Sequence, residues 1–508
     1  MRKPYTLLLS LLFLPLFVLG QTVTAHEGYH DTVLDTGDVT GPIQSALVGL
    51  GLLIFLGIIV FSVRLLQKPQ LSIPNPVTYF QKINSFSQNA RYFTLHIEGM
   101  SLMYGVRTIL FNIYLLYLFP DGIEFLGVTI GAVFFVGILL AIGSLISGII
   151  SPFAGILVDR IGKKWSFIFG DFWGAIMILI VILWPIPWVI VVAQIIRSAV
   201  MSIHSIAENP FIYEQSSEKE RAYLFSTLDG MSTLAMMSGN LLGGVVPLGI
   251  ALVLYQTAIV SGAAAIFVLQ IGLLVSVALW LGSLIPAVFL KEDPALRKQA
   301  QESIKTRMSF KNVTNWGTVG VFVLSAICIG LGAGMFVYFF SLFFLLFFNA
   351  NPAEIAVVFA LGALVTALGN FVSPLIAEKF GKVQVIVGTR LLSLPFLLLL
   401  PFAPGLLVAG VFYLLRGFFM NATTPTESAL AMEVVNDSER VTMEALRIAG
   451  MNIFTAVGFL LGSYLMDIGD FYSPFILATG FYLLAVVVFW AYFRNGRQVL
   501  PAKTPVPG

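Results

Sequence analysis

Ionisable side chains inside long apolar stretches are the residues of this sequence that could do chemistry. In one such stretch Arg197, Met201, His204 and Glu208 follow one another at intervals of four, three and four positions, which places them on one face of a helix. A charged group in apolar surroundings is costly unless it is paired or faces a cavity. The stripe therefore predicts a ligand or proton site, with structural pairing to a buried acid as the alternative.

The composition defines the kind of protein that carries this stripe. The 508 residues are 58% hydrophobic and only 11% charged, whereas soluble domains average roughly 25% charged residues. Apolar runs of at least ~18 residues recur, long enough to cross a bilayer as helices, and the period-2 alternation of a membrane barrel is absent. The sequence predicts an all-α polytopic membrane protein in a lipid bilayer. Its net charge of +2 gives no indication of nucleic-acid binding.

Twelve membrane-crossing segments are predicted between residues 90 and 495. They cover residues 91–119, 127–158, 165–184, 187–208, 223–247, 254–290, 314–347, 353–377, 384–402, 405–426, 443–466 and 471–493. A polar cytoplasmic loop at 292–313 separates a six-helix bundle at 90–291 from a second at 314–495. A further transmembrane helix is predicted at 43–67, followed by a cytoplasmic or interfacial segment at 68–89. Residues 496–508 form a cytoplasmic tail.

Lysine and arginine lie on one side of the predicted spans. The turns on the other side, including the stretch 247–257, contain neither residue, whereas the loop at 292–313 and the short turns on its side are basic. Because basic loops stay in the cytoplasm, the chain is predicted to be a multi-pass cell-membrane protein with its C-terminus inside.

The N-terminus has the features of a secretory signal peptide over residues 1–25, namely a basic start, an apolar core and small residues before Ala25. An uncleaved anchor is the alternative. The acidic tail at 26–42 should then lie outside. His26 and His30 within it are candidate metal ligands, with a solvated tail as the favoured interpretation. No other metal and no cofactor is predicted.

An internal repeat relates the two bundles. An offset of 219 positions pairs Arg197 with Arg416, Met201 with Met420, Glu208 with Glu427 and Glu214 with Glu433. The same offset aligns two charged turns, Asp159-Arg160-x-Gly162-Lys163 and Glu378-Lys379-x-Gly381-Lys382. Because charged residues are rare here, such coincidences indicate duplication of one six-helix unit in the same orientation, a parallel repeat.

The first charged turn resembles a signature of the major facilitator superfamily. Gly155-x-x-x-Asp159-Arg160-x-Gly162-Lys163-Lys164 matches the superfamily's pattern between spans two and three at every defined position. In the second copy Pro374 replaces the leading glycine. The resemblance covers about residues 90–495 and implies two six-helix bundles that work by alternating access. The signal-like start and the extra helix at 43–67 depart from the superfamily's common plan.

The resemblance also implies a conformational latch that bridges the two bundles when the cytoplasmic side is closed. Asp159 would then face residues 444–447, while Arg160 or Lys163 reaches Glu208 or Glu214. The alternative is that these charges only set the orientation of the chain in the membrane. Acidic residues contribute little to that orientation, so Asp159 argues against this alternative. The predicted latch residues are Gly155, Asp159, Arg160, Gly162, Lys163, Lys164, Glu208, Glu214, Glu378, Lys379, Gly381, Lys382, Glu427 and Glu433.

Arg197 matches the superfamily's span-four arginine, although the usual Gln-Gly after it is replaced by Val200-Met201. The resemblance implies that Arg197, and then Arg416, contacts substrate or couples proton movement, with pairing to a buried acid as the alternative. Arg390 occupies the repeat position of Asp171 with opposite charge, which suggests a pair between the bundles. The remaining candidates are Arg107, Tyr104, Asn112, Tyr114, His204, Asp171 and Asp229.

The sequence predicts transport and not catalysis. Phosphate-binding loops, H-E-x-x-H and G-x-S-x-G are absent. Gly239, Gly243 and Gly244 resemble a span-five motif of drug–proton antiporters, except that Asn240 replaces proline, and helix packing is the alternative. The predicted function is monomeric secondary active export of a small, amphipathic molecule, driven by an ion gradient such as protons. Import of a small metabolite and a non-transporting sensor are the alternatives.

Overall fold

The structure is a computed structural model of the 508-residue chain. It describes residues 86–125, 127–215, 221–257, 260–292, 315–435 and 437–494. The predictions of a signal peptide, an external tail with His26 and His30, an extra helix at 43–67, a central loop and a C-terminal tail lie outside these residues.

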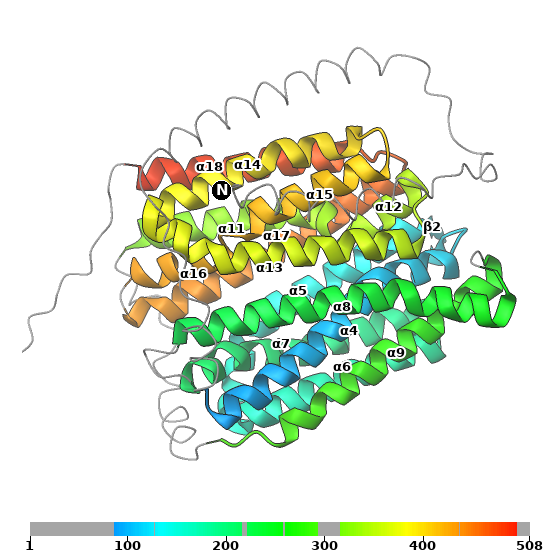
Figure 1. The fold of residues 1–508 in the computed structure, drawn as a ribbon, viewed down its shortest axis with the longest axis horizontal. Helices are drawn as coiled ribbons and strands as arrows, with labels where there is room; N and C mark the ends of the chain where they lie inside the picture. Colours follow the sequence, from blue (N-terminus) through cyan, green and yellow to red (C-terminus); the bar gives the residue numbers. More distant parts are fainter. Residues whose placement is uncertain are drawn as a thin grey trace, which may run out of the picture.

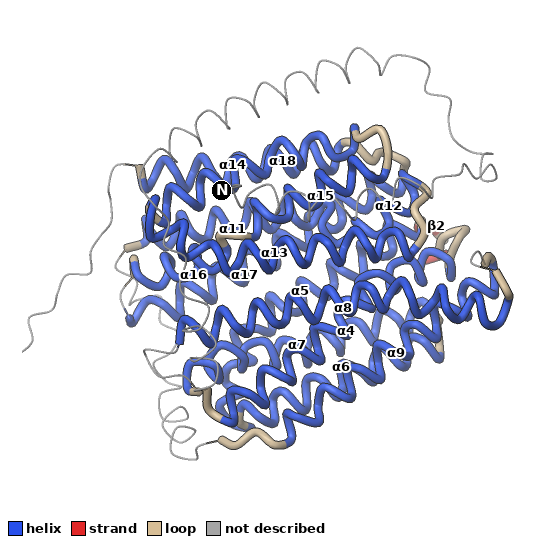
Figure 2. The backbone as a smooth tube through the Cα atoms, viewed as in Figure 1, coloured by secondary structure: helices blue, strands red, loops and turns tan. Residues whose placement is uncertain are grey.

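Six long helices form the first bundle. They are α4 (Gln88–Leu118), α5 (Ala132–Ile161), α6 (Lys163–Leu183), α7 (Pro187–Glu214), α8 (Arg221–Tyr255) and α9 (Gly262–Val288). An antiparallel hairpin of β1 (Ile123–Phe125) and β2 (Val128–Ile130) joins α4 to α5. Figure 2 shows how little of the described chain is strand.

The second bundle repeats this plan with breaks in two of its spans. It contains α11 (Trp316–Phe336), η3 (Val337–Phe339), α12 (Phe340–Phe348), α13 (Pro352–Phe380), α14 (Lys382–Leu399), η4 (Leu400–Phe402), α15 (Leu406–Asn421), α16 (Thr424–Glu433), α17 (Asp437–Asp467) and α18 (Ser473–Phe493). The described residues contain 12 candidate membrane spans by length and composition, so the prediction of twelve is confirmed.

Two predicted span boundaries are wrong for local reasons. Residues 247–255 are not an outer turn, because α8 continues through Pro247 to Tyr255; neighbouring helices make proline tolerable inside a membrane helix. Residues 128–130 form a strand and not the start of a helix. The predicted tenth span agrees with the candidate span Leu406–Ser428, but it contains a break between α15 and α16, with Pro425 in the first turn of α16, where proline is favoured and cannot continue the preceding helix.

The two bundles lie one above the other in Figure 1, with their helices running along the same direction. They meet mainly where α5 packs on α17 and α8 packs on α13. The 219-residue offset exchanges α5 with α13 and α8 with α17, so each of these two contacts is the counterpart of the other. The interface between the bundles therefore follows the symmetry of the repeat.

Buried apolar residues form three clusters that differ in which bundle supplies them. The largest joins both bundles and includes Leu115, Ile123, Phe343 and Phe475 toward the end that carries the β-hairpin, here called the hairpin end. At the opposite end, here called the basic end and marked by the turns at Gly162 and Gly381, one cluster comes only from the first bundle and the other only from the second. The bundles are thus fastened together at the hairpin end.

Small residues let the helices within each bundle approach closely. A methyl group at Gly239 on α8 would collide with the carbonyl oxygen of Leu102 on α4, and one at its repeat counterpart Gly458 on α17 would collide with that of Leu331 on α11. Gly239 on α8 therefore has a packing role, which does not exclude the transport role that the antiporter resemblance implies.

We expect Gly239→Ala to lower the free energy of unfolding by about 1–3 kcal/mol, the usual cost of overpacking. Gly249 lies on the same helix, and a methyl group added there would meet no neighbouring atom within 4 Å, so Gly249→Ala is the matched control. That control should stabilise the protein by up to about 1 kcal/mol through helix propensity. Equilibrium unfolding in mixed micelles measures both. Equal stability of the two variants would contradict the packing role.

Candidate functional site

Arg107 and Arg197 lie in the middle of the first bundle's spans. The guanidinium carbon of Arg107 stands 5.0 Å from the ring centre of Tyr104, and its buried Nε has no hydrogen-bond partner. Arg197 donates two hydrogen bonds to Oε1 of Gln194, at 3.2 and 2.7 Å, and the Gln194 amide donates to the carbonyl of Leu139. The two guanidinium groups lie within electrostatic range of each other.

Arg416 occupies the corresponding depth of the second bundle. It donates to the hydroxyl of Tyr482 at 3.0 Å, and its guanidinium carbon lies 4.8 Å from the ring centre of Phe336. Among the described residues, no carboxylate lies within ion-pair distance of Arg107, Arg197 or Arg416. Within this described part the partners of Arg197 and Arg416 are neutral, which gives no support to the alternative that they pair with buried acids.

Aromatic side chains from both bundles surround these arginines. Tyr338 of η3 lies near Arg107 and Tyr104 and packs on the ring of Phe459 at 5.0 Å. Its side chain is nevertheless 53% exposed. Exposure at a position between the two bundles indicates a space there that solvent reaches. Tyr338 is not among the site residues predicted from the sequence, because a tyrosine in a phenylalanine-rich stretch does not stand out.

The other candidates of the first bundle occupy different places. Asn112 donates to the carbonyl of Tyr338 at 2.8 Å, a link between the bundles. Tyr114 is fully buried and accepts a hydrogen bond from Gln270 at 3.3 Å, so it belongs to the packed core. Asp229 is exposed on α8, closer to the basic end. Of these three, only Asn112 lies beside the arginines.

The stripe Arg197, Met201, His204 and Glu208 does not face a single site. His204 lies seven residues beyond Arg197, about 10 Å along the helix, and its Nδ1 is 3.2 Å from Oδ1 of Asp171. His96 of α4 completes the group, with Nε2 3.1 Å from Oδ2 of Asp171. The ligand atoms of His96, Asp171 and His204 all lie within 4.8 Å of one another, and all three side chains are buried. We call this group the His–Asp cluster.

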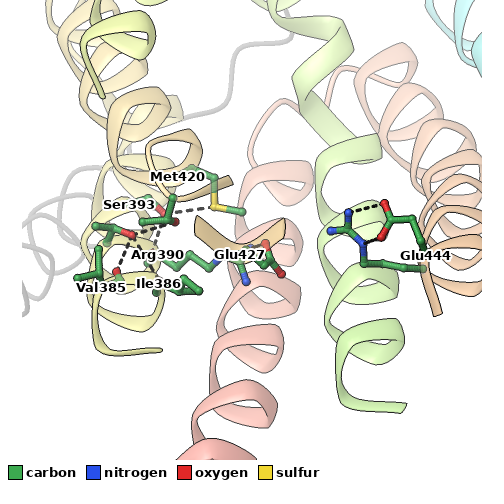
Figure 3. Close-up of polar contacts among 10 residues, drawn as sticks. Val385, Ile386, Arg390, Ser393, Met420, Glu427 and Glu444 are labelled. Atoms are coloured by element: carbon green, nitrogen blue, oxygen red, sulfur yellow. Dashed lines mark hydrogen bonds and ion pairs between the residues drawn. The ribbon is translucent and has the colours of Figure 1, made fainter. Parts of the chain in front are cut away.

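The predicted pair between Asp171 and Arg390 is wrong. Arg390 forms an ion pair with Glu427 inside the second bundle, and Figure 3 shows the two side chains facing each other, with Ser393 and Met420 nearby. Each bundle thus compensates its own charge between the third and fourth of its spans. The repeat alone does not predict these partners, because Thr423 stands at the position of His204 and Glu427 at that of Glu208, so only Asp171 and Arg390 differ in sign.

Two glycines form the charged turns at the basic end. Gly162 between α5 and α6 has φ of 92°, and Gly381 between α13 and α14 has φ of 88°. Residues with a side chain rarely adopt this conformation. Both copies of the charged motif therefore turn sharply at a glycine, with the same geometry.

The latch residues with described contacts pair within their own bundle. Lys163 Nζ lies 2.5 Å from Oε1 of Glu214, one of the contacts expected from the sequence, and the backbone N–H of Lys164 donates to Glu292. Glu427 is bound to Arg390 and does not reach the first bundle. The side chains of Gly155, Asp159, Glu378 and Glu433 lie outside the described part of the structure, so their role as a latch stays a prediction.

We expect Glu214→Gln to change the free energy of unfolding by less than about 1 kcal/mol. The pair with Lys163 is partly exposed, at 12% and 26% of the two side chains, and exposed ion pairs contribute little. A double-mutant cycle with Lys163→Gln measures the coupling. A coupling above about 2 kcal/mol would show that the pair is structural and not a contact that can be broken during a conformational change.

Two six-helix bundles related by a parallel repeat, with intramembrane arginines whose described partners are neutral, are typical of a transporter that moves its substrate through the space between the bundles. A family model described as Major Facilitator Superfamily matches residues 99–317 and 322–508. The chain therefore belongs to this superfamily and is a multi-pass membrane transporter, not an enzyme.

Solved structures share the fold at low sequence identity. The nucleoside transporter NupG has a TM-score of 0.60 and 13% identity, over 80% of this chain and 99% of NupG. A D-xylose–proton symporter has a TM-score of 0.58 and 16% identity, over 80% and 98% of the two chains. The human organic anion transporter MFSD10 has a TM-score of 0.55 and 13% identity, over 79% and 99%. None of the curated proteins matches the chain by sequence.

Proposed function

We propose that this transporter moves a small amphipathic molecule carrying an anionic group. The observation that supports the proposal is the set of three intramembrane arginines, Arg107, Arg197 and Arg416, whose described partners are neutral. Each unpaired charge at this depth costs several kcal/mol, and such residues are usually functional. An anion bound beside the arginines lowers that cost, and an anionic substrate would be bound there during each transport cycle.

The aromatic lining supports the amphipathic part of the proposal. Tyr104 and Tyr338 stand beside Arg107, and Phe336 and Tyr482 stand beside Arg416. Aromatic faces bind apolar groups and also hold cations in place. One structural relative is named an organic anion transporter, but at 13% identity it supports the fold alone, so the proposal depends on the arginines.

We also propose an orientation and a direction. The basic end would face the cytoplasm of the cell membrane by the positive-inside rule. The bundles share an apolar cluster at the hairpin end and have separate clusters at the basic end, so this structure would be an inward-facing state. Export coupled to proton entry is the proposed cycle, on the resemblance of the α8 glycine motif to that of antiporters.

The test is flux into proteoliposomes that contain the purified full chain. Aromatic carboxylates and their uncharged amides serve as the paired substrates, with a proton gradient imposed in either direction. We expect saturable flux of a carboxylate that is driven by the gradient and abolished by Arg197→Ala. Equal flux of the amides would contradict the anionic substrate. Ligand binding without flux under every gradient would contradict transport and support the sensor alternative.

A further inference from the structure

The His–Asp cluster lies apart from the arginines, inside the first bundle. Its residues come from α4, α6 and α7, which lie beside one another in the lower bundle of Figure 1. His96 and Asp171 are 0% exposed and His204 is 2% exposed. The rings of Phe93 and Phe167 pack against it, with ring centres 6.1 Å from His96 and 5.0 Å from His204 respectively. Two imidazoles and a carboxylate are thus gathered where water is largely excluded.

The hydrogen bond of His96 fixes the side of the ring that faces Asp171. Nδ1 of His96 lies 2.8 Å from the carbonyl oxygen of Ser283, and a carbonyl only accepts, so Nδ1 carries the proton. In the neutral ring Nε2 then presents a lone pair to the Asp171 carboxylate. A lone pair opposite an anion is repulsive, so a cation must lie between them, either a second proton on the ring or a metal ion. Nδ1–H bonded to a carbonyl with Nε2 free is also the arrangement typical of metal-bound histidine.

Four atoms of the cluster point at one another without forming hydrogen bonds. Nε2 of His96, both carboxylate oxygens of Asp171 and Nδ1 of His204 are buried, and none has a hydrogen-bond partner of acceptable geometry. Buried polar atoms almost always have partners. The two nitrogens lie 3.1 and 3.2 Å from different oxygens of Asp171, and one ligand atom of each residue lies within 4.8 Å of the others, so the three side chains can converge on one ion with bonds of about 2.0–2.1 Å.

The charge of the surroundings suits a divalent cation. Glu208 lies one turn beyond His204 and within electrostatic range of all three members of the cluster. Its carboxylate is not among the ligand atoms that lie within 4.8 Å of one another, so it contributes negative charge near the cluster and not a direct ligand. Two carboxylates and two neutral imidazoles balance one divalent ion. Imidazole ligands favour zinc and similar transition metals over magnesium or calcium.

We propose that His96, Asp171 and His204 bind a divalent transition-metal ion of the zinc class, with Glu208 supplying further negative charge nearby. The ion joins α4, α6 and α7 into one rigid unit. The second bundle has no such set, because Arg390 and Thr423 stand at the repeat positions of Asp171 and His204. An ion pair between Arg390 and Glu427 links the corresponding helices there. The metal site is therefore a property of one bundle and independent of the transported substrate.

The experiment uses the full chain with His26→Ala and His30→Ala, purified through a tag without histidine. The sequence has only 4 histidines, so this parent retains only the two in the cluster. After loading with Zn²⁺ and desalting, we expect about one zinc per chain by elemental mass spectrometry. His204→Thr, which copies the repeat position, and Asp171→Asn, which keeps the side-chain size, should each lower retained zinc at least tenfold. Glu214→Gln on the same helix α7 is the matched control and should retain it.

A second measurement does not depend on the variants folding. The parent loaded with Co²⁺ should show the intense visible absorption of four-coordinate cobalt. A monodisperse parent that retains no zinc and shows no such absorption would overturn the proposal. Equal zinc retention by the parent, His204→Thr and Asp171→Asn would also overturn it, since the bound metal would then lie elsewhere and the cluster would hold protons instead.

Discussion

Replacing Arg416 by glutamine should raise the KM for an anionic substrate by roughly 30-fold or more. Truncating one partner of a buried charge pair costs about 2–5 kcal/mol, and about 1.4 kcal/mol corresponds to tenfold in affinity. In the free protein the same change removes a charge whose described partners are the hydroxyl of Tyr482 and the ring of Phe336. We therefore expect stability to stay equal or increase while transport is lost, which separates a binding role from a structural one.

Tyr482→Phe is the matched control for this prediction. It keeps the charge of Arg416 and removes only the 3.0 Å hydrogen bond that positions it, an interaction worth about 0.5–1.5 kcal/mol. The KM should therefore rise by less than about tenfold. Initial rates of flux in proteoliposomes measure both variants, with the unfolding midpoint as a check on folding. An unchanged KM in Arg416→Gln would show that the substrate does not meet this arginine.

The membrane spans and the repeat were predictable because both are one-dimensional properties of the chain. Hydropathy locates a span wherever about 20 apolar residues follow one another, and the 12 spans agree with it. Charges such as Arg197 and Arg416 align under a single offset because few other charges compete with them. The errors fell at prolines and turns, as at Pro247, where neighbouring helices and not the local sequence decide whether a helix continues.

The partners of the buried charges were not predictable to the same extent. Asp171 and Arg390 have opposite signs at equivalent positions, which suggests a pair between bundles, yet each finds its partner one helix away in its own bundle. His96 was not a candidate, because a single histidine early in a helix gives no signal until folding brings it to Asp171. Which charged side chains pair depends on which faces of neighbouring helices are in contact. The periodicity of the sequence shows only which residues share a face of one helix.

These pairings bear on how the bundles can move. The ion pairs of Arg390 with Glu427, of Lys163 with Glu214 and of Arg447 with Glu444 all lie within one bundle. Contacts between the bundles in the described residues are instead hydrogen bonds and apolar packing. Asn112 and Ser144 donate to the carbonyls of Tyr338 and Asn452, and the carboxylate of Asp467 accepts from the backbone N–H of Phe134. The ion pairs named above therefore stay intact while each bundle moves as a rigid body, which alternating access requires.

Breaking the pair of Arg390 and Glu427 should have the largest effect on stability. Glu427→Gln leaves the guanidinium of Arg390 buried and unpaired, with Nε and one terminal nitrogen already lacking partners. Removing one member of a buried pair costs about 3–5 kcal/mol, whereas replacing both by apolar residues of similar size is often neutral. We expect Glu427→Gln to lower the free energy of unfolding by that amount, and Arg390→Met with Glu427→Leu to restore most of it.

Equilibrium unfolding in mixed micelles measures this prediction, with the partly exposed pair of Lys163 and Glu214 as the reference. Removing one charge of the reference pair should lower the free energy of unfolding by less than about 1 kcal/mol, because water still solvates the remaining charge. Comparing the loss of stability in the two pairs isolates the effect of burial, because both pairs link the third and fourth spans of their bundle. If the double apolar variant were no more stable than Glu427→Gln, the cost would come from lost hydrogen bonding and shape, and not from an uncompensated charge in the membrane.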